Sequence, residues 1–131
     1  MKILALGAHP DDIEIFMYGL ICIYKNEGNQ VFTMIATDGA KGGSQEDNLL
    51  IKQRAKETTA GLKDLSTPIF LNIPDSELGE DPVHQKIIKE NILNIMPDLI
   101  ITHSKNYYHA DHRSLSRLIS NAVSHYIPML F

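Results

Sequence analysis

Residues 2–12 read KILALGAHPDD, and this stretch decides the fold class of the chain. Its first part, residues 2–8, is an apolar run without alternation, which is typical of a strand buried on both faces of a parallel sheet. The polar residues 9–12 follow at once, where such a strand would lead into a helix. Open α/β sheets bind their ligands at this edge, outside the carboxyl ends of the strands. The stretch therefore predicts a buried parallel strand that delivers polar side chains to a ligand site.

Strand patterns and helix patterns alternate along the rest of the chain, with no repeats. The predicted strands cover residues 2–8, 30–37, 68–73 and 98–102, and the predicted helices cover 12–27, 49–65, 83–95 and 115–123. This βαβαβαβα order predicts the α/β class: a Rossmann-like open parallel sheet with right-handed crossovers and helices on both faces. We expect the strand order 3-2-1-4 in that sheet.

A second polar cluster, HADH at residues 109–112, follows the fourth predicted strand. With the strand order 3-2-1-4, the chain reverses direction between the first and fourth strands, and a crevice opens at their carboxyl ends. The two polar clusters leave these two strands. We therefore expect the clusters, which are remote in sequence, to meet in space.

Composition narrows the class of protein. With 131 residues the chain is one domain by size, 1–131, and 44% hydrophobic with 21% charged residues is ordinary for a globular protein. A formal charge of −4 with dispersed Lys and Arg argues against a nucleic-acid partner. Cys22 is the one cysteine, so neither an intrachain disulfide nor a thiolate zinc site is expected. No signal peptide or membrane-spanning stretch is visible, which favours a cytoplasmic protein with no membrane partner.

The end of the chain, IPMLF at residues 127–131, is apolar and follows the last predicted helix directly. The fourth strand would then be left as an uncovered edge of the sheet. We therefore expect a truncated chain, a homo-oligomer, or both.

The two clusters carry the ligand types that zinc prefers. Zinc binds imidazole nitrogen and carboxylate oxygen, and catalytic sites keep three protein ligands and one open position. His9 and Asp12 are three positions apart, as are His109 and His112, and one helical turn brings such pairs to the same side. A set of two histidines and one carboxylate leaves the ion a good Lewis acid. The clusters predict one Zn²⁺, or another divalent ion, per chain, and their spacing leaves open which histidine of the second pair binds it.

Hydrolysis at such a site needs a base and a donor to the oxyanion. Asp11 neighbours Asp12 but should point differently, so we predict it to be the general base. A protonated imidazole of His109 would be the donor, with Asp111 holding its charge and tautomer. The alternatives are that Asp11 or Asp12 caps a helix and that His109 lies in a surface loop. The metal site is favoured because both clusters lie at strand exits that flank one switch point.

The same residues resemble the signatures of a known family. Residues 8–14 (AHPDDIE) resemble the AHPDDxE motif, and residues 109–112 the HxDH motif, of the LmbE-like (PIG-L) zinc N-deacetylases. Shorter matches lie between them in the family's order: TDG at 37–39, RxxE at 54–57 and PD at 97–98. The resemblance implies a Rossmann-like, zinc-dependent hydrolase that removes an acetyl group from an N-acetylated amino sugar, such as an N-acetylglucosamine conjugate.

The resemblance also implies a role for each matched residue. It makes the zinc ligands His9, Asp12 and His112, the general base Asp11, and the electrophilic partner His109 with Asp111 in support. Two departures concern the substrate site. Phe16 and Tyr18 stand where the family commonly has glycines, and bulkier side chains there would shift the first helix. The chain is also shorter than typical members, so we expect it to lack the C-terminal portion that helps to shape their pocket.

Three further residues are candidates for substrate binding. Arg54 is either a substrate clamp or a solvated side chain, and Asp75 either bonds a sugar hydroxyl or forms a turn. Tyr107 could stack on a sugar ring or donate to an oxyanion. His103, just past the fourth predicted strand, is interpreted as a core histidine rather than a supporting residue of the site. The segment 41–44 (KGGS) is interpreted as a mobile lid.

Other functions are weighed beside the deacetylase. One is a zinc amidase acting on a non-sugar N-acyl substrate, and another is a degenerate family member that binds metal without turnover. A nucleotide-binding Rossmann domain is disfavoured, because a proline and two aspartates stand where a pyrophosphate would sit. His84 and His125 lie on or near predicted helices and are interpreted as structural or solvated.

Overall fold

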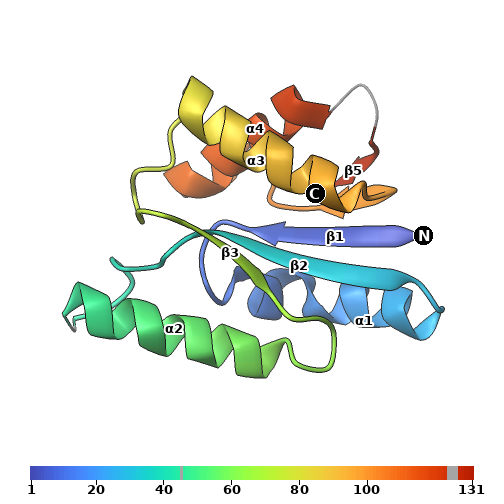
Figure 1. Cartoon of the computed structure of the whole chain (residues 1–131), viewed down its shortest axis with the longest axis horizontal. Helices are drawn as coiled ribbons and strands as arrows, with labels where there is room; N and C mark the ends of the chain where they lie inside the picture. The colour runs from blue at the N-terminus through green and yellow to red at the C-terminus, as the bar shows by residue number, and fades with distance from the viewer. Residues whose placement is uncertain (45, 124–126) are drawn as a thin grey trace.

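The computed structural model describes residues 1–44, 46–123 and 127–131, so the expectation for His125 lies outside the described residues. Five parallel strands form one sheet in the order β3-β2-β1-β4-β5 (Figure 1). The strands are β1 (Lys2–Gly7), β2 (Gln30–Thr37), β3 (Ile69–Ile73), β4 (Leu99–Ile101) and β5 (Met129–Leu130). The helices are α1 (Tyr18–Asn26), α2 (Asp47–Gly61), α3 (Pro82–Ile95) and α4 (Ala110–Val123), and a π-helical turn, η1 (Ile13–Met17), precedes α1. The predicted α/β class and the predicted order of the first four strands are confirmed.

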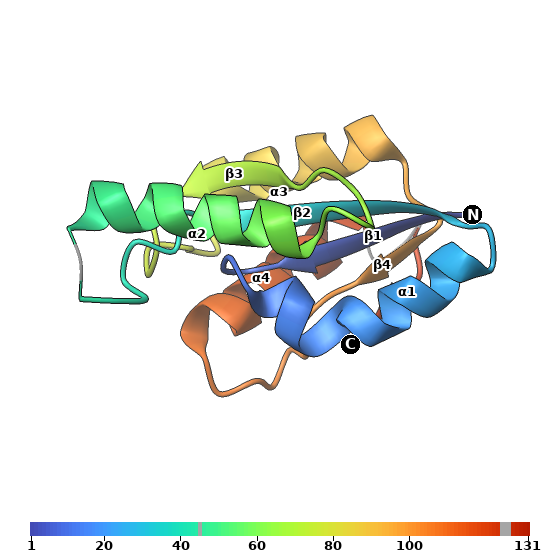
Figure 2. The same ribbon diagram turned by 90° about the horizontal axis from the view of Figure 1, so that it is seen from below.

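Helices cover both faces of the sheet. Figures 1 and 2 show α1 and α2 on one face and α3 and α4 on the other. The central strand β1 serves both layers, because successive side chains of a strand point to opposite faces. Ile3 and Ala5 pack with the residues of η1 and α1, whereas Leu4 and Leu6 pack with those of α3 and α4. Burial on both faces explains why residues 2–8 are apolar without alternation.

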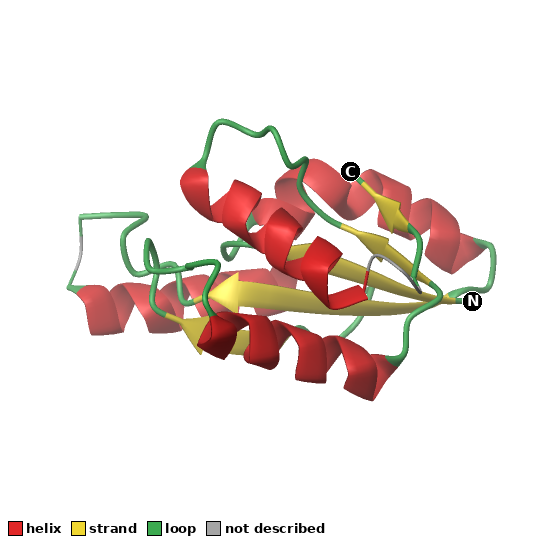
Figure 3. Ribbon diagram, turned by 90° about the horizontal axis from the view of Figure 1, so that it is seen from above, coloured by secondary structure: helices red, strands yellow, loops and turns green. Residues whose placement is uncertain are grey.

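The carboxyl ends of the strands all lie at one edge of the sheet (Figure 3). β1 pairs with β2 on one side, with Ile3 opposite Val31, and with β4 on the other, with Ile3 opposite Leu99. The chain therefore leaves the sheet centre in opposite directions on either side of β1. The segments after β1 and β4 are neighbours at this switch point, as the predicted strand order requires.

The apolar end of the chain has a role that we did not predict. We expected β4 to be left as an edge, but β5 pairs with it in parallel, with Ile100 opposite Met129 and Ile101 opposite Leu130. The amide of Thr102 donates to the carbonyl of Leu130 at 3.0 Å. A strand of two residues is too short for a periodicity argument to detect.

Two helices differ from their predicted bounds. The first predicted helix, 12–27, is divided into η1 and α1, and such π-helical turns are frequent at functional sites. The last helix begins at Ala110 rather than at Leu115, so Asp111 and His112 lie in its first turn. Both side chains are buried, which the apolar pattern from Leu115 onward could not indicate. Within the described residues, no helix is both long enough and apolar enough to span a bilayer.

Core packing by α3 gives a direct test of the fold. Ile88 is fully buried in the layer between the sheet, α3 and α4, whereas Val83 on the same helix is 65% exposed. Ile88→Ala is expected to lower the free energy of unfolding by about 2–5 kcal/mol, because it removes buried methyl groups and leaves a cavity. Val83→Ala is the matched control and is expected to change it by less than about 0.5 kcal/mol. Equal effects of the two variants in urea denaturation would contradict this packing of α3.

Candidate metal centre

The turn after β1 is held by the carboxylate of Asp12. The amide of His9 donates to Oδ2 of Asp12 at 2.7 Å, and the amide of Asp12 donates to the carbonyl of His9 at 3.3 Å. Among the described residues, the Asp12 side chain caps no amide of η1. The helix-capping alternative therefore does not describe Asp12, whose carboxylate faces back toward His9 at the edge of the sheet.

The two polar clusters meet at this edge. Nε2 of His112 lies 3.2 Å from Oδ1 of Asp12 and 3.2 Å from Nδ1 of His9, and Nδ1 of His9 lies 3.4 Å from Oδ2 of Asp12. All three side chains are buried or nearly so. Nitrogen and oxygen ligands about 2.0–2.1 Å from a tetrahedral zinc lie about 3.3 Å from one another. Each pair has a spacing that suits a shared small divalent cation, with Oδ2 of Asp12 facing His9 and Oδ1 facing His112.

The second ring nitrogen of His9 faces two carboxylates. Nε2 lies 3.0 Å from Oδ2 of Asp111 and 3.3 Å from Oδ1 of Asp75. Metal-binding histidines commonly donate their other N–H to a carboxylate, which fixes the tautomer and the ring orientation. This contact leaves Nδ1 of His9 as the nitrogen that faces Asp12 and His112.

The carboxylate of Asp111 contacts a different histidine from the one that we expected. We expected its carboxylate to support His109, but Oδ2 accepts from the amide of Ser76 at 3.2 Å and faces His9. The reason is that Asp111 lies in the first turn of α4, which directs its side chain toward the segment after β3. In the structure its carboxylate therefore contacts His9, at 3.0 Å from Nε2.

Charge within the cluster moves the pKa of two proposed ligands in opposite directions. Burial lowers the pKa of His9, but the carboxylates of Asp12, Asp111 and Asp75 outweigh burial and raise it to about 9. Burial raises the pKa of Asp12, but hydrogen bonds from His103, His112 and His9 outweigh burial and lower it far below its usual range. Asp12 is therefore an ionised, buried carboxylate surrounded by imidazoles.

The candidate site is larger than the three predicted ligands. Within residues 1–44, 46–123 and 127–131, three overlapping groups could hold a cation, with donor atoms within 4.8 Å of one another. They are His9 with His109 and His112, Asp12 with His103 and His112, and His9 with Asp75 and Asp111. His9, Asp12 and His112 join these groups into one cluster.

His109 lies beside the cluster with its ring centroid 4.8 Å from that of His9 and 5.0 Å from that of His112. Burial, followed by the neighbouring charges of His9 and His112, lowers the pKa of His109. We expected a protonated imidazole, but the lowered pKa keeps this ring neutral near pH 7. Its Nδ1 is buried and has no hydrogen-bond partner within the described part of the chain. A neutral His109 can still donate one N–H to a ligand.

Asp11 leaves the same turn in another direction than Asp12, because its φ is 101°. A φ in this region is uncommon outside glycine but is adopted more often by Asp and Asn than by other residues. Burial raises the pKa of Asp11, and the nearby guanidinium of Arg54 offsets part of that rise. The side chain is about half exposed. Asp11 is therefore accessible to solvent, whereas Asp12 is not.

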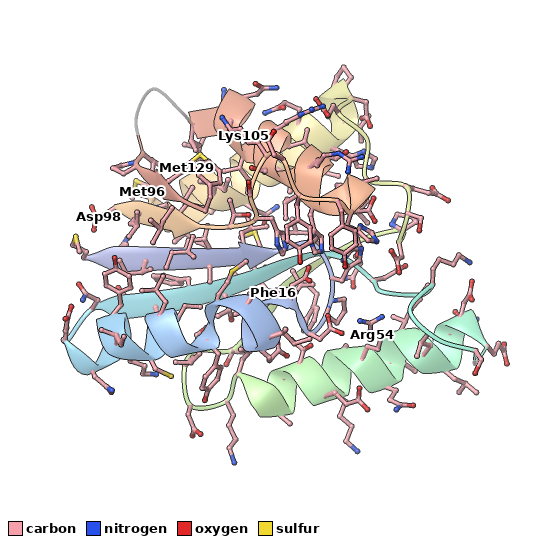
Figure 4. All side chains as sticks on the ribbon, turned by 180° about the vertical axis from the view of Figure 1, so that it is seen from behind. Phe16, Arg54, Met96, Asp98, Lys105 and Met129 are labelled. Atoms are coloured by element: carbon pink, nitrogen blue, oxygen red, sulfur yellow. The ribbon has the colours of Figure 1, made fainter. Side chains whose placement is uncertain are left out.

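Arg54 is engaged with this turn rather than free to clamp a substrate. Nη2 donates to Oδ2 of Asp11 at 2.8 Å and to the carbonyl of Pro10 at 2.6 Å, and Nη1 donates to the carbonyl of Gly39 at 3.2 Å. Figure 4 shows Arg54 reaching from α2 toward the strand ends. A Cβ at Gly42 would overlap Nη1 of Arg54, so this part of the predicted lid packs on the guanidinium.

A cavity of about 410 Å³ opens over the cluster. Its walls include seven of the predicted site residues and six others: His9, Asp11, Asp12, Ile15, Phe16, Lys41, Gly42, Arg54, Asp75, Ser76, Tyr108, His109 and His112. Asp75 lines this cavity, but Oδ2 accepts from the amide of Lys41 at 2.9 Å and Oδ1 faces His9. Asp75 is thus committed to contacts within the protein and lies in a turn closed by the amide of Glu77 and the carbonyl of Pro74, which agrees with the turn rather than with the sugar contact among the two alternatives.

Tyr107 does not line this cavity, although we expected it to bind substrate. Its ring packs against His112 with the centroids 4.8 Å apart, and it lines a smaller, largely apolar cavity of about 230 Å³ beside β4 and β5. Tyr108, 82% exposed, is the tyrosine that faces the larger cavity. Sequence alone could not separate two adjacent loop tyrosines.

Sequence reasoning also missed two residues of the site. His103 lies against Asp12 and His112, and Phe16 lies edge-on to both His103 and His112. His103 lies two residues after β4, so the rule that strand exits carry the site could have indicated it. Phe16 stood out in the sequence only as a bulky residue in place of the family's glycine, and nothing there indicated its contact with the two histidines.

The fold and the cluster together define a class: Rossmann-like α/β proteins with a histidine–aspartate site at the switch point of the sheet. Comparison with known proteins gives the family. The profile of the PIG-L family, described as GlcNAc-PI de-N-acetylase, matches residues 4–123. The chain belongs to the PIG-L family.

Solved structures with this fold include enzymes of more than one reaction type. The N,N'-diacetylchitobiose deacetylase from Pyrococcus horikoshii is 27% identical, with a TM-score of 0.87, and is matched over 94% of this chain and 49% of its own. The 4-carboxy-2-hydroxymuconate hydratase GalB from Pseudomonas putida is 20% identical, with a TM-score of 0.83 over 92% of this chain and 55% of its own. A deacetylase of teicoplanin biosynthesis is 16% identical, with a TM-score of 0.82 over 98% of this chain and 68% of its own.

The chain spans about half the length of the chitobiose deacetylase that it resembles. The likeness to the hydratase and to the teicoplanin deacetylase, at 20% identity or less, shows the fold alone. Since one fold hosts different reactions, the residues of the site rather than the fold decide the function.

Proposed function

We propose that this protein is a metal-dependent hydrolase that removes the acetyl group from an N-acetylated amino sugar or its conjugate. The observation that carries the proposal is the mutual contact of His9, Asp12 and His112, at 3.2–3.4 Å, on the floor of a cavity of about 410 Å³. Membership of the PIG-L family and the likeness to a chitobiose deacetylase support the amide substrate.

The donor set favours zinc among the divalent cations. Two imidazoles and one carboxylate match catalytic zinc sites, which keep a further position open. When bound, such a cation supplies a Lewis acid for the amide carbonyl and lowers the pKa of a coordinated water. His9, Asp12 and His112 would hold it, and Asp111 and Asp75 would fix the ring of His9 through Nε2.

Asp11 is the general base of the proposed reaction. It lines the cavity beside Asp12, and burial raises its pKa, which makes its carboxylate a stronger proton acceptor. A carboxylate oxygen of Asp11 takes the proton of the attacking water and returns it to the nitrogen of the leaving amine. The guanidinium of Arg54 holds this carboxylate in place through Oδ2.

His109 is the proposed partner of the carbonyl oxygen. Its ring lies at the cavity wall next to His9 and His112, and its lowered pKa makes it a neutral donor. One N–H directed at the oxygen stabilises the negative charge that develops there as the amide is attacked. Lys41, Ser76 and Tyr108 at the cavity rim supply polar groups and one aromatic face, which suit the hydroxyls and ring of a sugar.

The experiment that tests the proposal compares two substrate classes with the same chemistry. The chain is incubated with N-acetylglucosamine derivatives and, separately, with N-acetylated aliphatic amines, and the released amine is quantified. We expect release from the sugar, loss of it after chelation, and recovery on adding Zn²⁺. Release only from the non-sugar amines would favour the general amidase, whereas zinc binding without release from either class would support a member that binds metal without turnover.

Zinc binding is expected to release a proton near pH 7. The pKa of His9 is raised to about 9, so this ring is protonated at neutral pH and must lose its proton before Nδ1 can bind a cation. Affinity for Zn²⁺ should therefore rise about tenfold for each pH unit up to about 9 and level off above that value. Calorimetric titration at pH 7 in buffers of different ionisation enthalpy measures the released proton. Binding with no proton release at pH 7 would show that a neutral His9, or another group, meets the cation.

A further inference from the structure

His103 is a buried histidine for which the proposed reaction has no use. It lies two residues after β4 and is 5% exposed, with Nε2 3.1 Å from Oδ2 of Asp12. The preceding residue ties it to the sheet, because Oγ1 of Thr102 donates to the carbonyl of Leu6 at 2.8 Å and its amide donates to Leu130. The ring of His103 is therefore delivered to Asp12 from a fixed backbone.

The contact with Asp12 decides which nitrogen of His103 carries a hydrogen. The amide of Ala8 also points at Nε2, at 3.2 Å, but an amide can only donate and an ionised carboxylate can only accept. A single nitrogen cannot serve both groups. A hydrogen bond to a charged carboxylate is roughly twice as strong as one between neutral groups, so Nε2 carries the hydrogen and donates it to Asp12.

This donation leaves one oxygen of Asp12 for a cation. Oδ2 accepts from the amide of His9 at 2.7 Å and from Nε2 of His103 at 3.1 Å, which uses both of its lone-pair directions. Oδ1 is the oxygen that faces Nε2 of His112, at 3.2 Å. The same His103 ring stacks on the ring of His112, with centroids 3.7 Å apart and planes 10° apart. One residue therefore orients two of the proposed ligands.

We propose that His103 is a positioning residue of the metal centre, which turns Oδ1 of Asp12 toward the cation and sets the plane of His112. The inference rests on the proposed metal-dependent function, because it assigns His103 a task only if Asp12 and His112 bind a cation. The competing assignment is that His103 is itself a ligand, since its ring belongs to one of the three groups that could hold an ion. A third assignment is a packing role alone.

Two variants of the whole chain separate these assignments. His103→Gln keeps an N–H donor at nearly the same reach as Nε2, and His103→Phe keeps a flat ring that can stack on His112 but donates nothing. Affinity for Zn²⁺ is measured by competition with a chromophoric chelator, and the unfolding temperature is measured on the metal-free variants. His103→Phe is expected to bind Zn²⁺ about 10–100-fold more weakly while it remains folded, and His103→Gln should recover most of the affinity.

The outcomes that overturn the proposal are distinct. If the folded His103→Phe variant binds Zn²⁺ with wild-type affinity, His103 has a packing role alone. If both variants lose the same affinity for Zn²⁺, His103 is a ligand. A readout without metal or turnover is the tautomer of His103 in the wild-type chain, observed by long-range ¹⁵N–¹H NMR at a pH where the ring is neutral. The Nε2–H form is expected, and an Nδ1–H form would overturn the proposal. Zinc binding without deacetylation would refute the proposed function and leave this inference standing.

Discussion

Replacing His112 with alanine is expected to abolish retention of the cation. Nε2 of His112 lies within 3.2 Å of both other proposed ligands, so the variant removes one of three donors and opens one side of the cluster. Free energies of zinc binding in small protein sites, shared among their ligands, amount to about 3–4 kcal/mol per ligand, which is about 10²–10³-fold in affinity. Deacetylation should fall by at least as much, because the metal-free site lacks its Lewis acid.

The measurement for His112→Ala is metal content after gel filtration, together with the dissociation constant for Zn²⁺. Arg117→Ala is the matched control on α4, because its half-exposed side chain pairs with Glu80 at the surface, away from the cluster. The control should bind zinc like the wild-type chain. Full metal occupancy in a folded His112→Ala variant would show that His112 is not a ligand, and His103 or His109 would then be the alternative ligand.

Replacing Asp11 with asparagine is expected to separate binding from turnover. Asparagine has nearly the same shape and also tolerates a positive φ, so the turn from His9 to Asp12 should persist. The amide cannot take a proton from water, and loss of a positioned base costs about 10²–10⁴-fold in kcat. Affinity for Zn²⁺ should stay close to that of the wild-type chain, because Asp11 contacts Arg54 rather than the ligand atoms.

Two further measurements make the Asp11 result specific. Arg54→Met removes the ion pair to Asp11 but keeps the carboxylate, so its effect on kcat should be smaller than that of Asp11→Asn. The wild-type chain should lose activity as the pH falls through the pKa of Asp11, and this limb should lie above the usual range of an aspartate because burial raises that pKa. Turnover by Asp11→Asn at the wild-type rate would remove Asp11 from the mechanism.

The local pattern of residues was enough to predict the class of fold. Four apolar runs, each followed by a helix pattern, imply parallel strands with crossovers, and the buried run at residues 2–8 implies a central strand. These inferences hold because burial of apolar side chains is the main driving force of folding, and the spacing of apolar residues in the sequence indicates which faces are buried. The same logic brought residues 9–12 and 109–112 to one edge of the sheet.

The pattern could not predict which atom faces which. The carboxylate of Asp111 was expected to contact His109, but it contacts His9. The guanidinium of Arg54 was expected to bind substrate, but it is paired with Asp11. Both outcomes depend on the direction in which a side chain leaves its helix. For Asp111, that direction is set by the residue at which α4 begins. His103 was interpreted as core, because its partner Asp12 is separated from it by most of the chain.

The amino-acid sequence by itself determined the alternation of strands and helices, the strand that lies at the centre, and the chemical types gathered at its exit. These follow from local periodicity and from the rule that parallel strands end at one edge. Only the tertiary structure decided the pairing: Asp12 with three imidazoles, His9 with two further carboxylates, and β5 on the free side of β4. Hydrogen-bond directions and pKa values are set within a few ångströms by residues far apart in the chain, and that proximity exists only once the sheet has formed.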